Sequence, residues 1–309
     1  MVYTARGMMK QNKVLTGSLC ALGCETLYGL SYIFTRRATA NAGELALLGW
    51  RFLIAVIIVT ILAAAGAVKI DLKNKPLKYL VAVAVSNPCI YFIAETFGIS
   101  NTTASESGVF LACIPVVSLA ASALVLKKKP SKIQIAGILI TLIGVIITVL
   151  VVSASSSLSI IGYVSLLIAV VSYAAYGVSV EKASCFTEAE ITYSMLVFGA
   201  VLFVFLALAD ALMNGNIAEL AMLPFTDMSF LSAVLYQGLG CSILAFFLSN
   251  AAISRIGVNR TSSFIGVSTV VSILAGAIFL HEDFSGYQIV GAAIIIAGVY
   301  IANSGRKDS

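Results

Sequence analysis

Apolar residues occur in ten long runs that are separated by short polar or charged stretches. A helix needs about 20 mostly apolar residues to cross the hydrocarbon core of a bilayer. The strict alternation of apolar and polar residues that favours a membrane β-barrel does not occur in these runs. The pattern predicts an all-α polytopic membrane protein with ten transmembrane helices, at about residues 14–35, 44–67, 77–98, 103–126, 132–152, 160–181, 190–212, 228–250, 258–280 and 285–303.

The stretches between the runs carry charged residues and turn-forming residues. We expect loops at 73–76, 101–102, 127–130, 153–159, 213–225 and 281–283. Two prolines, Pro88 and Pro115, lie inside apolar runs instead. Since proline removes a backbone hydrogen bond, we expect kinks in the third and fourth helices.

The second half of the chain repeats the first. A shift of 154 residues places Gln134 on Gln288, Gly137 on Gly291 and Gly144 on Gly298 without a gap, and a shift of 148 places Tyr28-Gly29 on Tyr176-Gly177. Each half contains five runs, an odd number, so the two halves must enter the membrane from opposite sides. The predicted organisation is two inverted five-helix repeats, with these boundaries: tail 1–13, repeat 14–152, Ser-rich linker 153–159, repeat 160–303 and tail 304–309.

The basic residues predict the orientation of the helices. With the N-terminus placed inside, Arg36 and Arg37 are the two basic residues outside and Arg51 lies within a run, so the other sixteen of the 19 Lys and Arg fall inside. Such a bias is typical of cytoplasmic loops. No small-residue cleavage site follows the first run, which we interpret as a retained helix. The expected location is the cell membrane, with several passes and with both termini in the cytoplasm.

Composition excludes a soluble protein. The chain is 60% hydrophobic and 11% charged, and its mean hydropathy is +1.03, whereas a soluble domain carries about 25% charged residues. The excess apolar surface must contact lipid. The six cysteines show no zinc-type spacing. Cys20 and Cys24, one helical turn apart, allow a soft-metal site, but small apolar filling is the favoured interpretation. No metal or cofactor is predicted.

Several motifs give the chain, over about residues 14–303, a resemblance to the drug/metabolite transporter superfamily, in particular to its tandem EamA-type members. They are Tyr28-Gly29-Leu30-Ser31 with its mate Tyr176-Gly177-Val178-Ser179, Arg51, Pro115, Gln134, Gly137 and Gly144, and His281-Glu282 followed by Gln288, Gly291 and Gly298. The family usually has Trp before the first glycine, and the first half has lysines where the family has the Glu. The resemblance implies a ten-helix basket with a central cavity lined by helices 1, 3, 4, 6, 8 and 9.

Four ionisable residues, all in the first half of the chain, stand out within the predicted spans, where charge is costly and is usually paired or functional. Glu25 is a candidate proton carrier or counter-charge for an amino group, or else a structural carboxyl group. Arg51 is a candidate substrate or gating contact, or else pairs with Glu95 or Glu25 or snorkels outward. Glu95 is likewise a candidate substrate or coupling residue, or else it lies in the lipid headgroup layer. Glu106 either joins the site or only favours the helix dipole.

Polar residues on single helix faces extend the candidate site. Asn87, Tyr91 and Glu95 follow at a spacing of four residues and share one face of the third helix. Thr269 belongs to a stripe of small residues on the ninth helix, which either lines a cavity or packs helices. The kinks near these residues fit a cavity or benign packing equally well.

Aromatic and glycine positions complete the set of candidates. Tyr28, Tyr176 and Gln237 can contact a substrate, although tyrosines at such positions are as typical of a core or an interface. The glycines of the fifth and tenth helices recur every seven residues, at Gly137, Gly144, Gly291 and Gly298. We interpret them as faces for close helix packing.

These features favour a secondary transporter that exports a small metabolite, an amino acid or a drug-like compound by alternating access, with protons as a candidate coupling ion. The chain has no Walker A loop and a single histidine, so neither ATP drive nor a membrane enzyme is supported. A non-transporting scaffold or receptor and a facilitative channel are the alternatives. The expected partners are a small-molecule substrate and the lipid bilayer, with no nucleic acid, for a monomer or a homodimer.

Overall fold

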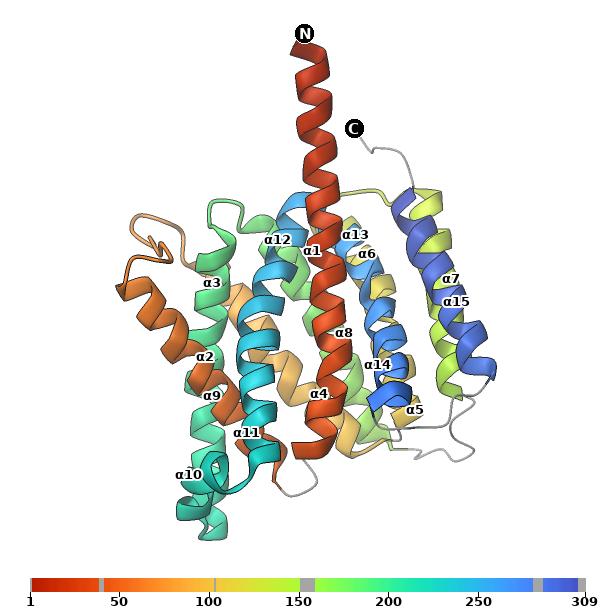
Figure 1. The fold of residues 1–309 in the computed structure, drawn as a ribbon. Helices are drawn as coiled ribbons and strands as arrows, with labels where there is room; N and C mark the ends of the chain where they lie inside the picture. The colour runs from red at the N-terminus through yellow and green to blue at the C-terminus, as the bar shows by residue number, and fades with distance from the viewer. Residues whose placement is uncertain (1, 39–41, 103, 151–158, 280–285, 305–309) are drawn as a thin grey trace.

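The computed structural model describes residues 2–38, 42–102, 104–150, 159–279 and 286–304, and all regular secondary structure in these ranges is helical. The prediction of an all-α protein is confirmed. The helices are packed into one bundle (Figure 1). Their bounds are α1 (Val2–Ala38), α2 (Glu44–Ala64), α3 (Lys78–Ala84), η1 (Val85–Ile90), α4 (Tyr91–Ser100), α5 (Ala104–Ala112), α6 (Ile114–Val125), α7 (Lys132–Leu150), α8 (Ile160–Lys182), α9 (Glu188–Asn214), α10 (Ile217–Thr226), α11 (Met228–Leu235), η2 (Tyr236–Ala245), α12 (Phe246–Ile256), α13 (Val258–Ser263), α14 (Ile265–Phe279) and α15 (Gly286–Ser304).

Eight helices in the described ranges are long and apolar enough to cross a membrane. Four of them are composites, since helices that follow one another directly make a single span: α3 to α4, α5 to α6, α11 to α12 and α13 to α14. The two remaining predicted spans correspond to α1 and α7, so the full count of ten rests on the sequence. Figure 1 shows the start of α1 and the end of α15 at the same end of the bundle. The predicted linker at 153–159 lies, apart from Ser159, outside the described residues, as does the 281–283 turn with the His281-Glu282 motif.

The loop predicted at 213–225 is wrong in part. The preceding helix α9 continues to Asn214, where Gly215 ends it with φ +71°, and α10 then begins at Ile217. Residues 217–222 are Ile, Ala, Glu, Leu, Ala and Met, which include strong helix formers. The Trp50 indole fixes this helix because its Nε1 donates to the Leu220 carbonyl at 2.9 Å.

Both predicted proline interruptions are present. At Pro88 the span is π-helical over η1, and Asn87 has non-helical angles of φ −144° and ψ 120°. At Pro115, α5 ends at Ala112 and a new helix, α6, begins at Ile114. The polar side chains around Asn87 are therefore carried by a broken helix, not by a regular one.

The two halves run in opposite directions and interlock. Gly17, at the start of the first apolar run, packs against Ile256. Glu181, at the end of α8, accepts a hydrogen bond from the amide of Val258, which follows Ile256 by two residues. The start of this run and the end of α8 therefore lie at the same end of the bundle. The first helix of each half is therefore antiparallel to the other. In addition, α1 packs on α12 and α14 of the second half, and α8 packs on α4 and α6 of the first.

The glycine faces predicted on the fifth and tenth helices are confirmed. Helices α7 and α15 lie side by side, and a Cβ atom at Gly298 would lie 2.5 Å from the backbone nitrogen of Thr141. A Cβ at Gly137 would lie 2.3 Å from the backbone nitrogen of Ala302. Since neither gap admits a side chain, the small residues set the distance between these two helices.

Candidate functional site

Arg51, on α2, lies in a buried polar cluster between the two halves, and its side chain is 6% exposed. Its Nε donates to Ser242 Oγ at 2.9 Å and its Nη1 donates to Gln237 Oε1 at 2.8 Å, both on η2. The predicted pairing with Glu25 or Glu95 is not seen among the described residues, because neutral oxygens of η2 occupy these donors. The burial also excludes the alternative in which Arg51 snorkels outward.

Glu25, on α1, is 5% exposed. Its carboxyl group lies close enough to interact with the Ser268 hydroxyl of α14, which donates to the Ile265 carbonyl at 2.7 Å. Tyr91, Tyr173 and Tyr176 all lie close enough to interact with it electrostatically. The structure therefore brings the acid of the first helix to aromatic hydroxyl groups from α4 and α8.

Glu95 and Tyr91, predicted on one face of the third helix, contact each other: the Tyr91 hydroxyl donates to Glu95 Oε1 at 2.7 Å. Glu95 also lies close enough to Arg51 for an electrostatic interaction. Asn87 is 4% exposed, and its buried Oδ1 has no hydrogen-bond partner among the described residues. The helix break at Asn87 separates it from the regular spacing of Tyr91 and Glu95.

Tyrosine rings connect these helices. Tyr91 of α4 packs edge-on against Tyr173 of α8 with ring centroids 5.4 Å apart, and Tyr173 packs edge-on against Tyr176 at 5.5 Å. The Tyr176 hydroxyl donates to Asn250 Oδ1 at 2.8 Å and lies 3.1 Å from Ser249 Oγ. Tyr176, at 1% exposure, therefore anchors α8 to α12 as well as bordering the cluster.

Several members of this cluster were missed from the sequence, namely Phe92, Ser242, Ser249, Asn250 and Ser268. All five are neutral, and each contacts a residue more than 40 positions away in the chain. Neither their charge nor their local spacing therefore identifies them from the sequence. Asn250 also donates to Thr192 Oγ1 at 3.0 Å and so extends the network to α9.

The remaining predicted residues are placed as follows. Tyr28 is half-buried on α1, near Tyr173 and Tyr176. Thr269 is half-buried on α14, next to Ser268, which is the residue that reaches Glu25. The Glu106 side chain lies outside the described residues. Within the described ranges no three His, Cys, Asp or Glu side chains are close enough to hold a metal ion.

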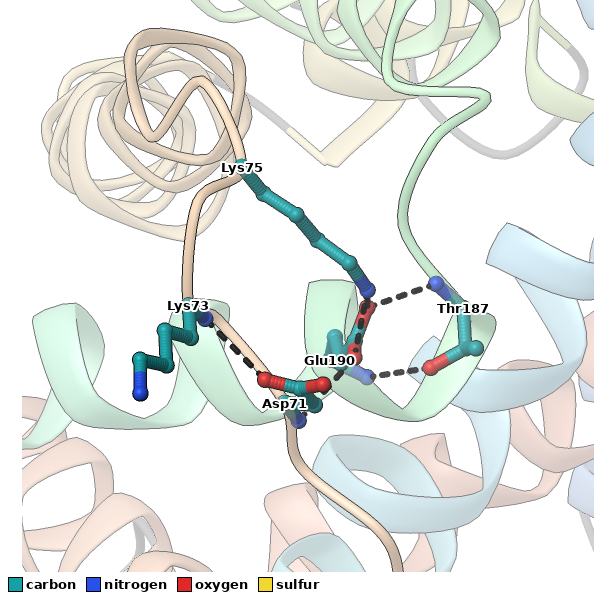
Figure 2. A network of polar contacts seen from close by, with 5 residues as sticks. All are labelled: Asp71, Lys73, Lys75, Thr187 and Glu190. Carbon is teal, nitrogen blue, oxygen red and sulfur yellow. Dashed lines mark hydrogen bonds and ion pairs between the residues drawn. The ribbon is translucent and has the colours of Figure 1, made fainter.

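A second set of charges lies at the end of the bundle where the first apolar run begins. Figure 2 shows Glu190, in the first turn of α9, as its centre. The Glu190 carboxylate accepts from Lys75 Nζ at 2.8 and 2.7 Å, from the Asp71 amide at 3.1 Å and from the Thr187 amide at 2.9 Å. Thr187 in turn accepts from the Glu190 amide, which completes a capping box.

Two further ion pairs lie at this end. Lys128 pairs with Glu181, whose other oxygen accepts from the Val258 amide at 3.0 Å. Arg255 pairs with Glu188 at 2.7 Å. Since Lys75 and Lys128 belong to the first half and their partners to the second, these contacts join the two halves at one end of the molecule.

Comparison with known proteins gives consistent matches along the chain. The pattern of the EamA-like transporter family matches residues 15–150 and 160–304. The uncharacterized transporter YcxC of Bacillus subtilis is 31% identical over 279 residues, which cover 90% of this chain and 89% of that protein. A probable amino-acid metabolite efflux pump of Salmonella typhimurium is 24% identical over 282 residues, 91% of this chain and 92% of the pump. A solved structure titled only as a crystal structure of a protein superposes with a TM-score of 0.75 at 17% identity, covering 95% of this chain and 97% of that one, which shows a shared fold.

Proposed function

The chain belongs to the EamA-like transporter family of the drug/metabolite transporter superfamily, and we propose that it exports a small organic metabolite across the cell membrane by alternating access. One observation carries this proposal: the buried Glu25 and Arg51 and the half-buried Glu95 come from three different helices and are gathered with tyrosines at one place between the halves. Ionisable residues inside a membrane are costly and mark substrate or ion pathways.

The interlocked halves support the alternating-access part of the proposal. Movement of one repeat against the other opens a central site first to one side and then to the other. The ion pairs of Lys75 with Glu190 and of Lys128 with Glu181 join the halves at one end only in the described structure. In our proposal this end faces the cytoplasm, and both pairs separate when the site opens inward.

The two acids support a role for protons. Neither Glu25 nor Glu95 has an ion pair within the described residues, and each carboxyl group instead interacts with a neutral hydroxyl group, of Ser268 and Tyr91 respectively. In our proposal a carboxyl group takes up one proton from outside and releases it inside for each metabolite that leaves. The name of the Salmonella typhimurium relative, a probable amino-acid metabolite efflux pump, makes amino acids and their derivatives the first substrates to test.

A facilitative channel is the second candidate, because an acid-lined pathway also serves passive flow. A carrier and a channel differ in counterflow: only a carrier takes up labelled substrate faster when the liposome interior holds unlabelled substrate. A scaffold or receptor would give no uptake at all.

The experiment uses the full chain in proteoliposomes loaded with unlabelled amino acids and diluted into trace labelled amino acids. We expect saturable counterflow, and we expect an imposed proton gradient to drive net transport. Glu25→Gln and Glu95→Gln should each abolish the response to the proton gradient. Glu219→Gln, which changes an exposed acid on α10, is the matched control and should keep it. Transport that ignores both substitutions would overturn the assignment of the acids.

A further inference from the structure

The Arg51 guanidinium group is only partly satisfied. It has five N–H donors, and two of its nitrogens are used: Nε by Ser242 and Nη1 by Gln237. The group lies over two aromatic rings, 5.1 Å from the centroid of Phe52 and 4.8 Å from that of Phe92. The third nitrogen, Nη2, is fully buried and has no hydrogen-bond partner within the part of the chain that the structure describes.

An unpaired cation is difficult to reconcile with a purely structural role. Burying a donor without a partner is costly, and more so when the group is charged. Among the described residues no acid forms an ion pair with Arg51, and Glu95 instead accepts from Tyr91. If packing were the only role, a neutral side chain of similar length would serve better.

We propose that Arg51 binds a carboxylate group of the transported molecule, with Nη2 as the free donor. The inference rests on the proposed function and deepens it, since it names the chemical group that the site recognises. Gln237 and Ser242 hold the guanidinium group in one orientation from one side, and Phe52 and Phe92 hold its faces. Its remaining edge is therefore preorganised for a planar anion that accepts charge-assisted hydrogen bonds.

The charge of the site favours a carboxylate over a phosphate group. Among the Lys and Arg residues of the predicted apolar runs, Arg51 alone lies more than three residues from a run's end, so the cluster supplies a single positive charge against Glu25 and Glu95. When Glu25 and Glu95 carry protons, one guanidinium group balances a monoanion, whereas a phosphate dianion would remain uncompensated in the membrane interior. Because Nη2 is closed off from solvent here, the carboxylate reaches it when the halves move apart.

The test compares two pairs of ligands that differ only in the carboxylate group: leucine with leucinamide, and benzoate with benzamide. Binding to the purified full chain is measured by titration calorimetry for the unaltered protein, Arg51→Lys and Arg51→Gln. Arg255→Gln is the control, because Arg255 pairs with Glu188 at the charged end of the bundle and makes no contact with Arg51 among the described residues. Thermal unfolding without ligand shows whether each variant is folded.

The unaltered protein and the Arg255→Gln control should bind at least one carboxylate more tightly than its amide. In Arg51→Gln that preference should fall by roughly 10- to 100-fold, the equivalent of one charge-assisted hydrogen bond, and Arg51→Lys should keep part of it. A structural role for Arg51 would weaken both members of a pair equally, and that result overturns the inference. The absence of carboxylate binding by the unaltered protein also overturns the inference. In that case, transport of amides would leave the proposed carrier function standing, whereas the absence of both transport and counterflow would refute the proposed function itself.

Discussion

Replacing Glu190 with Gln tests how far the charged end of the bundle stabilises the fold. The side chain of Glu190 is 3% exposed and accepts four hydrogen bonds, two of them from Lys75 Nζ. Glutamine keeps one acceptor oxygen, places an amide donor where the second oxygen was, and removes the charge that balances Lys75. Glu190 therefore loses both its ion pair and part of the network drawn in Figure 2.

The magnitude follows from these contacts. Hydrogen bonds to charged groups contribute about 1.5–3 kcal/mol each, and removing one partner of a well-buried pair costs about 3–5 kcal/mol. Lys75 keeps 25% exposure, so its ammonium group can turn toward water and recover part of the loss. We expect Glu190→Gln to lower the free energy of unfolding by about 2–4 kcal/mol.

The assay is reversible unfolding in mixed detergent micelles, with Glu188→Gln as the matched control. Glu188 lies two residues earlier in the same helical turn, but its side chain is 25% exposed and its partner Arg255 is 32% exposed. Exposed pairs contribute about 0–1 kcal/mol, so this control should lose far less. Equal losses in the two variants would refute the reasoning, because they would show that the burial of Glu190 adds nothing.

Three further predictions use the same measurement. Gly298→Leu should separate α7 from α15 and destabilise the protein by about 2–4 kcal/mol. Its control is Gly286→Leu, at a position where a Cβ meets nothing within 4 Å, and this variant should change stability by less than about 0.5 kcal/mol. Similar losses in the two variants would contradict the packing argument. Asn250→Ala should cost about 2–3 kcal/mol, because it removes both the nearer acceptor of the buried Tyr176 hydroxyl and the amide group that donates to Thr192 Oγ1; a neutral result would contradict it. Trp50→Phe should cost about 1 kcal/mol by removing the hydrogen bond to α10, and protease cleavage within α10 should become faster; unchanged cleavage would show that the indole does not hold this helix.

The sequence was sufficient wherever one physical rule acts locally. Apolar runs of bilayer length predicted the spans, Pro88 and Pro115 predicted the interruptions, and the heptad glycines predicted the contact of α7 with α15. The α10 helix was missed because a short apolar helix within a connecting segment has no length signal, and the tertiary hydrogen bond that it accepts comes from Trp50, 170 residues away.

The candidate site was predicted in part, for a different reason. Charged residues inside apolar runs are conspicuous, so Glu25, Arg51 and Glu95 could be found from the sequence. Their partners could not, because Gln237 lies 186 residues and Ser242 lies 191 residues from Arg51. Charge alone suggested an ion pair for Arg51, whereas the fold supplies neutral oxygens instead.

Counterflow in proteoliposomes, measured with and without a proton gradient, tests the central claim that Glu25 and Glu95, which lie between the two halves, move a substrate. The account predicts saturable uptake of a labelled metabolite by the unaltered chain and by Glu219→Gln, and loss of gradient-driven uptake when Glu25 and Glu95 are both changed to Gln. Full gradient-driven uptake by the Glu25→Gln, Glu95→Gln double variant would contradict it.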